Sequence, residues 1–272
     1  MNLNKKMKIS IITTMTNPEE RRDPWKEALN CYEDLADEII ITGKDWPIEF
    51  SWEQIGQYFQ EGFNQASYDW VIRMDLDYFF RKKDFVKIRN FLSKNSDSPV
   101  ISFPQYQIFT PDRYQVKTKL CNAFNKKRFP QILLNGGGDL CQPTLNNKQL
   151  LHKNFPTSNT PIYQYDSIFR TKEIISNDRA RFARAWYRYF KDYSNRGGPT
   201  SEEAFDAWFE MIISRYKFHV NKLNINDHPI FIRDSLLSLK NEQFGFSAFG
   251  LKDNINRSVF DKFIGYKQRY FG

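Results

Sequence analysis

From Lys8 to Phe103, short apolar runs rich in β-branched residues alternate with segments of helical periodicity. Strands are predicted at 8–14, 38–42, 70–74 and 100–103. One intervening helix begins at Ser51, where Gln54 completes a capping-box pattern. Its apolar positions recur every four residues, at Ile55, Phe59 and Phe63. Strands joined through helices pair in parallel, so the pattern predicts an α/β fold with a mixed, mainly parallel sheet flanked by helices.

The chain has 272 residues and carries 40 Lys and Arg against 32 Asp and Glu, which gives a formal net charge of +8. This excess favours acidic ligands such as nucleotides, anionic membrane surfaces or nucleic acid. The three cysteines lie far apart without metal-ligand spacing, which indicates reduced thiols and a cytoplasmic location. We expect neither a signal peptide nor a membrane-spanning helix, so any membrane contact is expected to be peripheral.

The third predicted strand runs directly into two acids, Asp75 and Asp77. In extended backbone, residues two apart point to the same side, so both carboxylates can face one point beyond the end of the strand. Open α/β sheets bind ligands at the carboxyl ends of their strands. Two carboxylates suit a hard divalent cation, Mg²⁺ or Mn²⁺, which keeps its other positions for water and substrate phosphates. The alternative is a solvated turn that happens to contain two acids.

The pattern loosens between Tyr106 and Tyr165 into short β-like pieces and polar turns. Asn135 to Asp139 contains three consecutive glycines, which indicate either a close approach to a ligand or a flexible surface turn. The remainder is helical, with a second capping-box pattern at Thr200. The helix before it carries arginines that suggest a solvated face, or a patch for phosphate or acidic lipid: Arg179, Arg181, Arg184 and Arg188.

Several of these features together resemble the GT-A class of nucleotide-sugar glycosyltransferases, especially the family-2-like enzymes, in which the acidic pair is the DxD metal motif. The resemblance is carried by Thr13-Thr14, the strand 38–41, the lead-in 69–73 and Asp75-x-Asp77. It continues weakly in the segment 162–172 and in His228-Pro229. Two positions depart from the family pattern, since Tyr78 replaces an acidic residue and Gln164 replaces a histidine.

The resemblance implies a role for each matching position. A Mn²⁺ or Mg²⁺ ion would be bound by Asp77 with Asp75, which could also contact the ribose, and His228 could complete the metal shell. Asp139 is the first candidate for the catalytic base and Asp166 the second. The nucleotide sugar would contact the end of the first strand and nearby basic residues: Thr13, Thr14, Met15, Arg21, Arg22 and Arg73.

The predicted function is therefore metal-dependent transfer of a sugar from a UDP-, GDP- or dTDP-sugar to a carbohydrate or lipid-linked acceptor. Residues 1–160 would form the GT-A-like catalytic core, and residues 161–272 a helical C-terminal part that completes the acceptor side. One alternative is a nucleotidyltransferase of related fold, although the segment 13–22 lacks the expected glycine-rich phosphate loop. A haloacid-dehalogenase-like phosphatase fits less well, because its Asp-x-Asp motif ends the first strand. The non-enzymatic alternative is a basic, aromatic-rich nucleic-acid-binding module, whereas the transferase hypothesis predicts no nucleic-acid partner.

Overall fold

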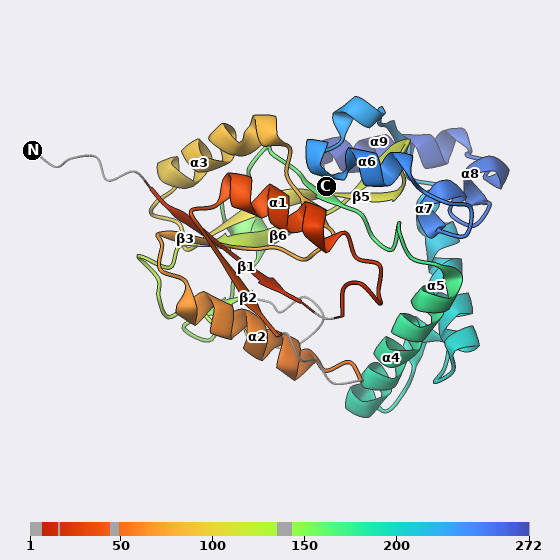
Figure 1. Ribbon diagram of the computed structural model, residues 1–272, viewed down its shortest axis with the longest axis horizontal. Coiled ribbons are helices and arrows are strands. Elements are labelled where there is room, and N and C mark those ends of the chain that lie inside the picture. Colours follow the sequence, from red (N-terminus) through yellow and green to blue (C-terminus); the bar gives the residue numbers. More distant parts are fainter. Residues whose placement is uncertain (1–6, 16, 44–48, 135–142, 272) are drawn as a thin grey trace, which may run out of the picture.

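The computed structural model describes residues 7–15, 17–43, 49–134 and 143–271, and its central feature is an eight-stranded sheet (Figure 1). Along the sheet lie β2 (Glu38–Thr42), β1 (Ile9–Thr14), β3 (Trp70–Arg73), β6 (Arg113–Phe124), β5 (Val100–Thr110), β9 (Ile162–Gln164) and β4 (Tyr78–Phe79). The short strand β10 (Asn221–Lys222) pairs with the beginning of β6. The pairings orient β1, β2, β3, β5, β9 and β10 in one direction and β4 and β6 in the other. The prediction of a mixed, mainly parallel sheet is confirmed.

Helices cover both faces of this sheet. Successive residues of a strand point to opposite faces, so neighbouring residues of β1 are buried against different helices. Ile9 and Ile11 of β1 are buried in a cluster with residues of α1 (Trp25–Leu35), α3 (Phe85–Lys94) and α6 (Arg233–Leu237). Ile12 is buried in a second cluster, with Phe59 and Phe63 of α2 (Trp52–Gln65). Figure 1 shows α1 and α3 on one side of the sheet and α2 on the other. The predicted cap of α2 is present, since the Ser51 hydroxyl accepts a hydrogen bond from the Gln54 N–H at 3.3 Å.

The hairpin of β5 and β6 is more regular than the sequence suggests. Short β pieces and turns are predicted beyond Tyr106, whereas β5 continues to Thr110 and β6 follows after a tight turn. Shifts of register interrupt the pairing between Ile101 and Ser102 and again between Gln105 and Tyr106. Each shift resets the alternation of inward and outward side chains, which removes the two-residue periodicity from the sequence. A separate small hairpin consists of β7 (Thr144–Leu145) and β8 (Lys148–Gln149).

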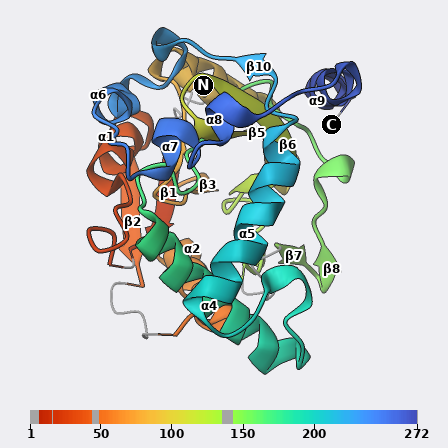
Figure 2. The same cartoon turned by 90° about the vertical axis from the view of Figure 1, so that its right-hand side faces the viewer.

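The C-terminal part packs α4 (Lys172–Phe190) beside α5 (Ser201–Tyr216), as Figure 2 shows. Thr200 and Glu203 form the predicted capping box of α5. The apolar stripe of α5 is core packing, because Phe205, Trp208 and Ile212 are buried with residues of β5 and of α7 (Phe244–Ser247). The chain ends with α8 (Leu251–Asn254) and α9 (Val259–Phe271).

The main sheet includes strands from both predicted parts of the chain. Since β9 and β10 follow residue 160, the sheet extends across the boundary expected there, and the division into 1–160 and 161–272 stays a prediction. Every helix in the described part of the chain is too short or too polar to cross a bilayer.

Candidate active site

A pocket of about 480 Å³ lies where β1 and β3 end. These two strands are parallel neighbours, so their carboxyl ends meet at one edge of the sheet. The polar lining comes from the end of β1 and the loop after it (Thr14, Asn17, Glu20, Arg21, Asp23), the end of β3 and the turn after it (Arg73, Asp75, Asp77), the end of β9 and the segment after it (Gln164, Asp166, Arg170), and α4 (Asp178, Arg179, Arg181). Phe59 and Phe182 are among the apolar lining residues. Three of the segments that carry the resemblance, at 13–14, 69–77 and 162–172, thus contribute residues to one cavity.

Asp75 and Asp77 lie in a turn and not in the extended backbone that the sequence suggests. The strand β3 ends at Arg73, and the Tyr78 N–H donates to the Asp75 carbonyl at 2.8 Å, which closes the turn. The Tyr32 hydroxyl donates to the same carbonyl at 2.6 Å and fixes the turn against α1. Both carboxylates nevertheless line the pocket. A hydrogen-bonded turn, and not strand alternation, brings the two acids to the same cavity.

The carboxylate of Asp77 is electrostatically unfavourable in its surroundings. Burial raises the pKa of Asp77 to about 7, and the nearby carboxylates of Asp75 and Asp166 add to the effect. Compensating contacts are weak, since Gln164 Nε2 is 3.4 Å from Asp77 Oδ2. Asp75 has a closer cation, because the Arg73 guanidinium lies 3.5 Å from its Oδ1. A cation bound between these acids would favour the ionised form of Asp77.

These residues fit a hard divalent cation that takes part of its coordination shell from other molecules. Within the described ranges, no group of three or more His, Cys, Asp or Glu side chains is arranged to hold a metal ion. Asp75 and Asp77 supply oxygen ligands, which Mg²⁺ and Mn²⁺ prefer. An ion at this turn would therefore need water or substrate oxygens for its remaining positions, and a diphosphate could supply the latter.

Asp166 also lines the pocket and differs from Asp77 in its partners. Burial alone would raise its pKa, but the positive charges of Arg179, Lys117 and Arg170 lower the pKa of Asp166 below the usual value. The Arg179 guanidinium lies 3.6 Å from Asp166 Oδ1, and the Ser167 hydroxyl donates to the same oxygen at 3.0 Å. Asp166 is thus held as a carboxylate at neutral pH.

A partly buried group of charges joins the loop after β1 to α4. Arg170 is bonded through its two terminal nitrogens to Asp23 and to Asp178, the latter at 3.0 Å. The Arg21 Nε is within 3.4 Å of a carboxylate oxygen of each acid. No sequence pattern connects Asp23 with Arg170 or Asp178, so sequence reasoning missed this network. It fixes Arg21, one of the predicted donor-binding residues, at the wall of the pocket.

Of the other residues predicted to bind the nucleotide sugar, some line the pocket and others do not. Thr14 and Arg73 line the pocket, and the Arg73 guanidinium also stacks on the Phe59 ring at 4.1 Å. Thr13 is fully buried, and among the described residues its hydroxyl has no hydrogen-bond partner. Met15 packs against the apolar core, with its N–H bonded to the Thr42 carbonyl at 3.2 Å.

His228 does not line this pocket, and neither do Thr13, Met15 and Arg22. His228 is fully buried elsewhere, with Nδ1 2.8 Å from the Tyr165 hydroxyl and Nε2 2.7 Å from the Pro111 carbonyl. Because both ring nitrogens have protein partners, neither is available to a metal in this arrangement. Asp139 lies outside the described residues, as does the triple glycine before it.

The arginines of α4 are engaged with the protein's own acids, and do not form a free basic face. Besides Arg179, Arg181 lies 3.7 Å from Asp178, and Arg184 and Arg188 both contact the Glu49 carboxylate, at 2.6 and 3.2 Å. Arg184 and Arg188 are 36% and 51% exposed, as on a solvated face, whereas Arg179 and Arg181 line the pocket. The pairing with acids weakens the nucleic-acid alternative, which required these arginines for phosphate contacts.

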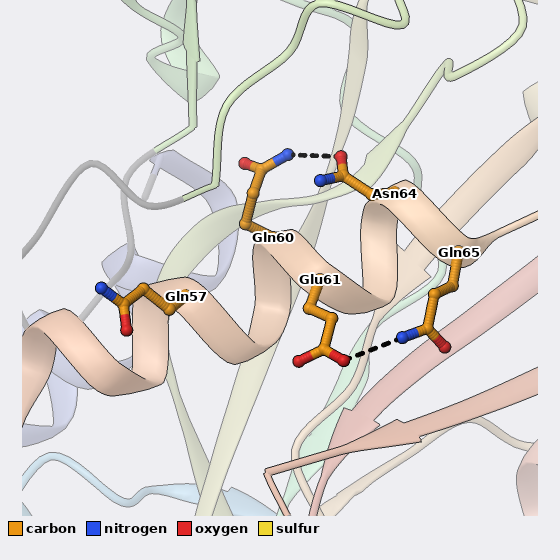
Figure 3. A pocket seen from close by; sticks show the side chains of 5 residues that line it. All are labelled: Gln57, Gln60, Glu61, Asn64 and Gln65. Atoms are coloured by element: carbon orange, nitrogen blue, oxygen red, sulfur yellow. Dashed lines mark hydrogen bonds between the residues drawn. The ribbon is translucent and has the colours of Figure 1, made fainter.

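A second depression lies on the outer surface of α2 and has no comparable chemistry (Figure 3). Its lining residues all belong to one helix: Gln57, Gln60, Glu61, Asn64 and Gln65. Figure 3 shows two pairs of them hydrogen-bonded along the helix, Gln60 with Asn64 at 2.9 Å and Gln65 with Glu61 at 3.0 Å. These contacts between residues four apart are typical of a solvated helix surface.

Comparison with known proteins gives low structural similarity and no sequence match. No protein-family model and no curated protein matches the chain. Among solved structures, S. aureus TarS 1-349 in complex with UDP is similar with 14% identity and a TM-score of 0.39, over 70% of this chain and 74% of that chain. A complex of the same protein with UDP-GlcNAc is similar with 12% identity and a TM-score of 0.38, over 78% and 73% of the two chains.

Proposed function

We propose that the protein is a metal-dependent glycosyltransferase that moves a sugar from a nucleotide-sugar donor to a carbohydrate or lipid-linked acceptor. One observation carries the proposal. Asp75 and Asp77 share a pocket with Arg21 and Arg73 at the carboxyl edge of parallel strands. Carboxylates suit the cation, and guanidinium groups suit the phosphate oxygens that the cation would share. Carboxylates and guanidinium groups in one cavity suit a nucleoside diphosphate bound together with its metal ion. They suit a free metal ion or a metal-free diphosphate less well.

The proposed roles follow from these positions. Asp77 and Asp75 would hold Mn²⁺ or Mg²⁺, which stabilises the negative charge on a departing nucleoside diphosphate when it is bound. Thr14 would lie beside the nucleotide, and Arg21 would face phosphate or sugar. Arg73 is positioned by Phe59 and orients Asp75.

We propose two candidates for the catalytic base. Asp166 lines the pocket as a carboxylate, but its lowered pKa makes it a weaker proton acceptor than an ordinary aspartate. Asp139 remains the other candidate from the sequence. A cytoplasmic location, with the donor and acceptor meeting near a membrane surface, completes the proposal.

A donor-hydrolysis assay tests this function. Purified protein is incubated with Mn²⁺ and UDP-, GDP- or dTDP-sugars, and the released nucleoside diphosphate is measured. Asp77→Ala should abolish metal-dependent release while circular dichroism shows an unchanged fold. Asp34→Ala is the matched control, because Asp34 is an exposed acid paired with Lys82 at 2.7 Å outside the pocket. Equal turnover in Asp77→Ala and wild type would refute the assignment.

A further inference from the structure

The C-terminal helix α9 presents a row of large apolar side chains to solvent. Val259, Phe260, Phe263 and Tyr266 are 84%, 68%, 63% and 48% exposed. With 3.6 residues per turn, these four positions fall on one side of the helix. Isolated exposed apolar residues are common, but a continuous row on one helix indicates a binding surface. We call these four residues the α9 apolar face.

The opposite side of α9 is fixed against the body of the protein. Gly265 faces β6 and the segment before β10, where a Cβ atom would lie 2.6 Å from the Phe218 carbonyl oxygen and 2.6 Å from Val220 Cγ2. The start of the helix is also capped, since the Asp261 carboxylate accepts from the Ser258 N–H at 3.0 Å and the Ser258 hydroxyl accepts from the Asp261 N–H at 3.0 Å. The α9 apolar face therefore points away from the body, and Figure 2 shows α9 at the edge of the molecule.

Lysines lie within and beside the α9 apolar face. Lys262 and Lys267 are both exposed, and in helical projection they lie at or beside the apolar row. Asp261, the acid in the first turn of α9, is occupied by the cap. On α8 the exposed Lys252 is followed by the exposed Asp253, and the whole chain carries a net charge of +8. This arrangement is typical of amphipathic helices that lie in the interface of a bilayer, where lysines contact anionic headgroups.

We propose that α9 docks the protein on an anionic membrane surface, with the α9 apolar face inserted among the lipids and Lys262 and Lys267 at the headgroups. The helix has 13 residues, which suits a helix lying in the membrane plane and not one crossing it. Charge complementarity favours lipid over a second copy of this chain. Pairing two α9 helices would bring their lysines together, whereas an anionic surface attracts them. This binding requires no metal and no nucleotide.

Co-sedimentation of the full chain with vesicles tests the proposal. We expect the wild type to bind vesicles of equimolar phosphatidylserine and phosphatidylcholine more tightly than vesicles of phosphatidylcholine alone, and the difference to shrink with added salt. Phe260→Ser with Phe263→Ser should weaken binding at least about tenfold, because two aromatic rings lose their burial in lipid. Leu237→Ser is the matched control, since Leu237 is 71% exposed on α6 and should change nothing.

Charge reversal provides an independent variant. Lys262→Glu with Lys267→Glu should remove the preference for phosphatidylserine, whereas reversal of the exposed Lys83, outside α9, should leave it nearly unchanged. Light scattering determines the oligomeric state of each variant. A wild type that ignores both kinds of vesicle, or one that forms a dimer which Phe260→Ser with Phe263→Ser converts to a monomer, would overturn the proposal. Asp77→Ala should bind vesicles like wild type, so failure of the transferase assignment and failure of membrane docking are separable.

Discussion

Replacing Asp77 with asparagine should stabilise the metal-free protein at pH 8. The native pKa of Asp77 is about 7 against an ordinary value of 3.8. Between about pH 4 and pH 7 the unfolded chain loses this proton and the native state keeps it, so stability falls as the pH rises and the loss is complete above pH 7. The full shift corresponds to about 4 kcal/mol, and because solvent partly reaches the carboxylate we expect roughly 2 kcal/mol.

Chemical denaturation in EDTA measures this difference, which corresponds to a rise in melting temperature of roughly 4 to 8 °C. The gain from Asp77→Asn should shrink as the pH falls towards the ordinary pKa of 3.8 and disappear well below it, where Asp77 is protonated in both states. Asp84→Asn is the matched control. Asp84 is 2% exposed and pairs with Arg81 at 2.8 Å and Lys87 at 3.1 Å, so its replacement should destabilise the protein by about 1 to 3 kcal/mol. An Asp77→Asn protein no more stable than wild type at pH 8 would refute the electrostatic account of the site.

Three further perturbations test the packing around the site and the C-terminal helix. Gly265→Ala should lower the free energy of unfolding in urea by about 1 to 3 kcal/mol, because the added methyl meets the Phe218 carbonyl; an unchanged midpoint would contradict the docking of α9. Burial, with Arg257 nearby, lowers the pKa of His219 to about 3, so His219 contributes a slope of about 1.4 kcal/mol per pH unit between pH 6 and pH 4, with stability falling towards pH 4, opposite in sign to the slope from Asp77. His219→Phe should remove that slope, and a slope equal to wild type would contradict it. Arg170→Met should cost about 1.5 to 3 kcal/mol in thermal unfolding, since it removes charge-assisted contacts from the partly buried Asp23 and Asp178 while Arg21 stays beside both, and unchanged stability would contradict the pairing.

The alternating framework of the fold was predictable because its signals are local. Ile9, Ile11 and Ile12 read as a buried strand from composition alone, and the caps at Ser51 and Thr200 depend on residues three positions apart. The β5–β6 hairpin was missed, because its register shifts break the periodicity that marks a strand.

The site was partly predictable for the same reason. Asp75 and Asp77 are close in sequence, so their shared pocket could be expected even though the turn that creates it could not. The pairing of Arg170 with Asp23 joins residues 147 positions apart and leaves no local pattern. His228 was proposed from a short motif, whereas its ring nitrogens are held by partners from distant segments. The sequence therefore did not predict the contacts between polar and charged residues that lie far apart in the chain.

Equilibrium binding of Mn²⁺, measured with and without UDP, GDP or dTDP, tests the central claim most directly. We predict that wild type binds Mn²⁺, that one of these nucleoside diphosphates tightens the binding, that Asp77→Ala abolishes it and that Asp34→Ala retains it. Equal Mn²⁺ binding by Asp77→Ala and wild type, or no binding of the ion with any of the three nucleotides, would contradict the claim that Asp75 and Asp77 form the metal site of a nucleotide-sugar pocket.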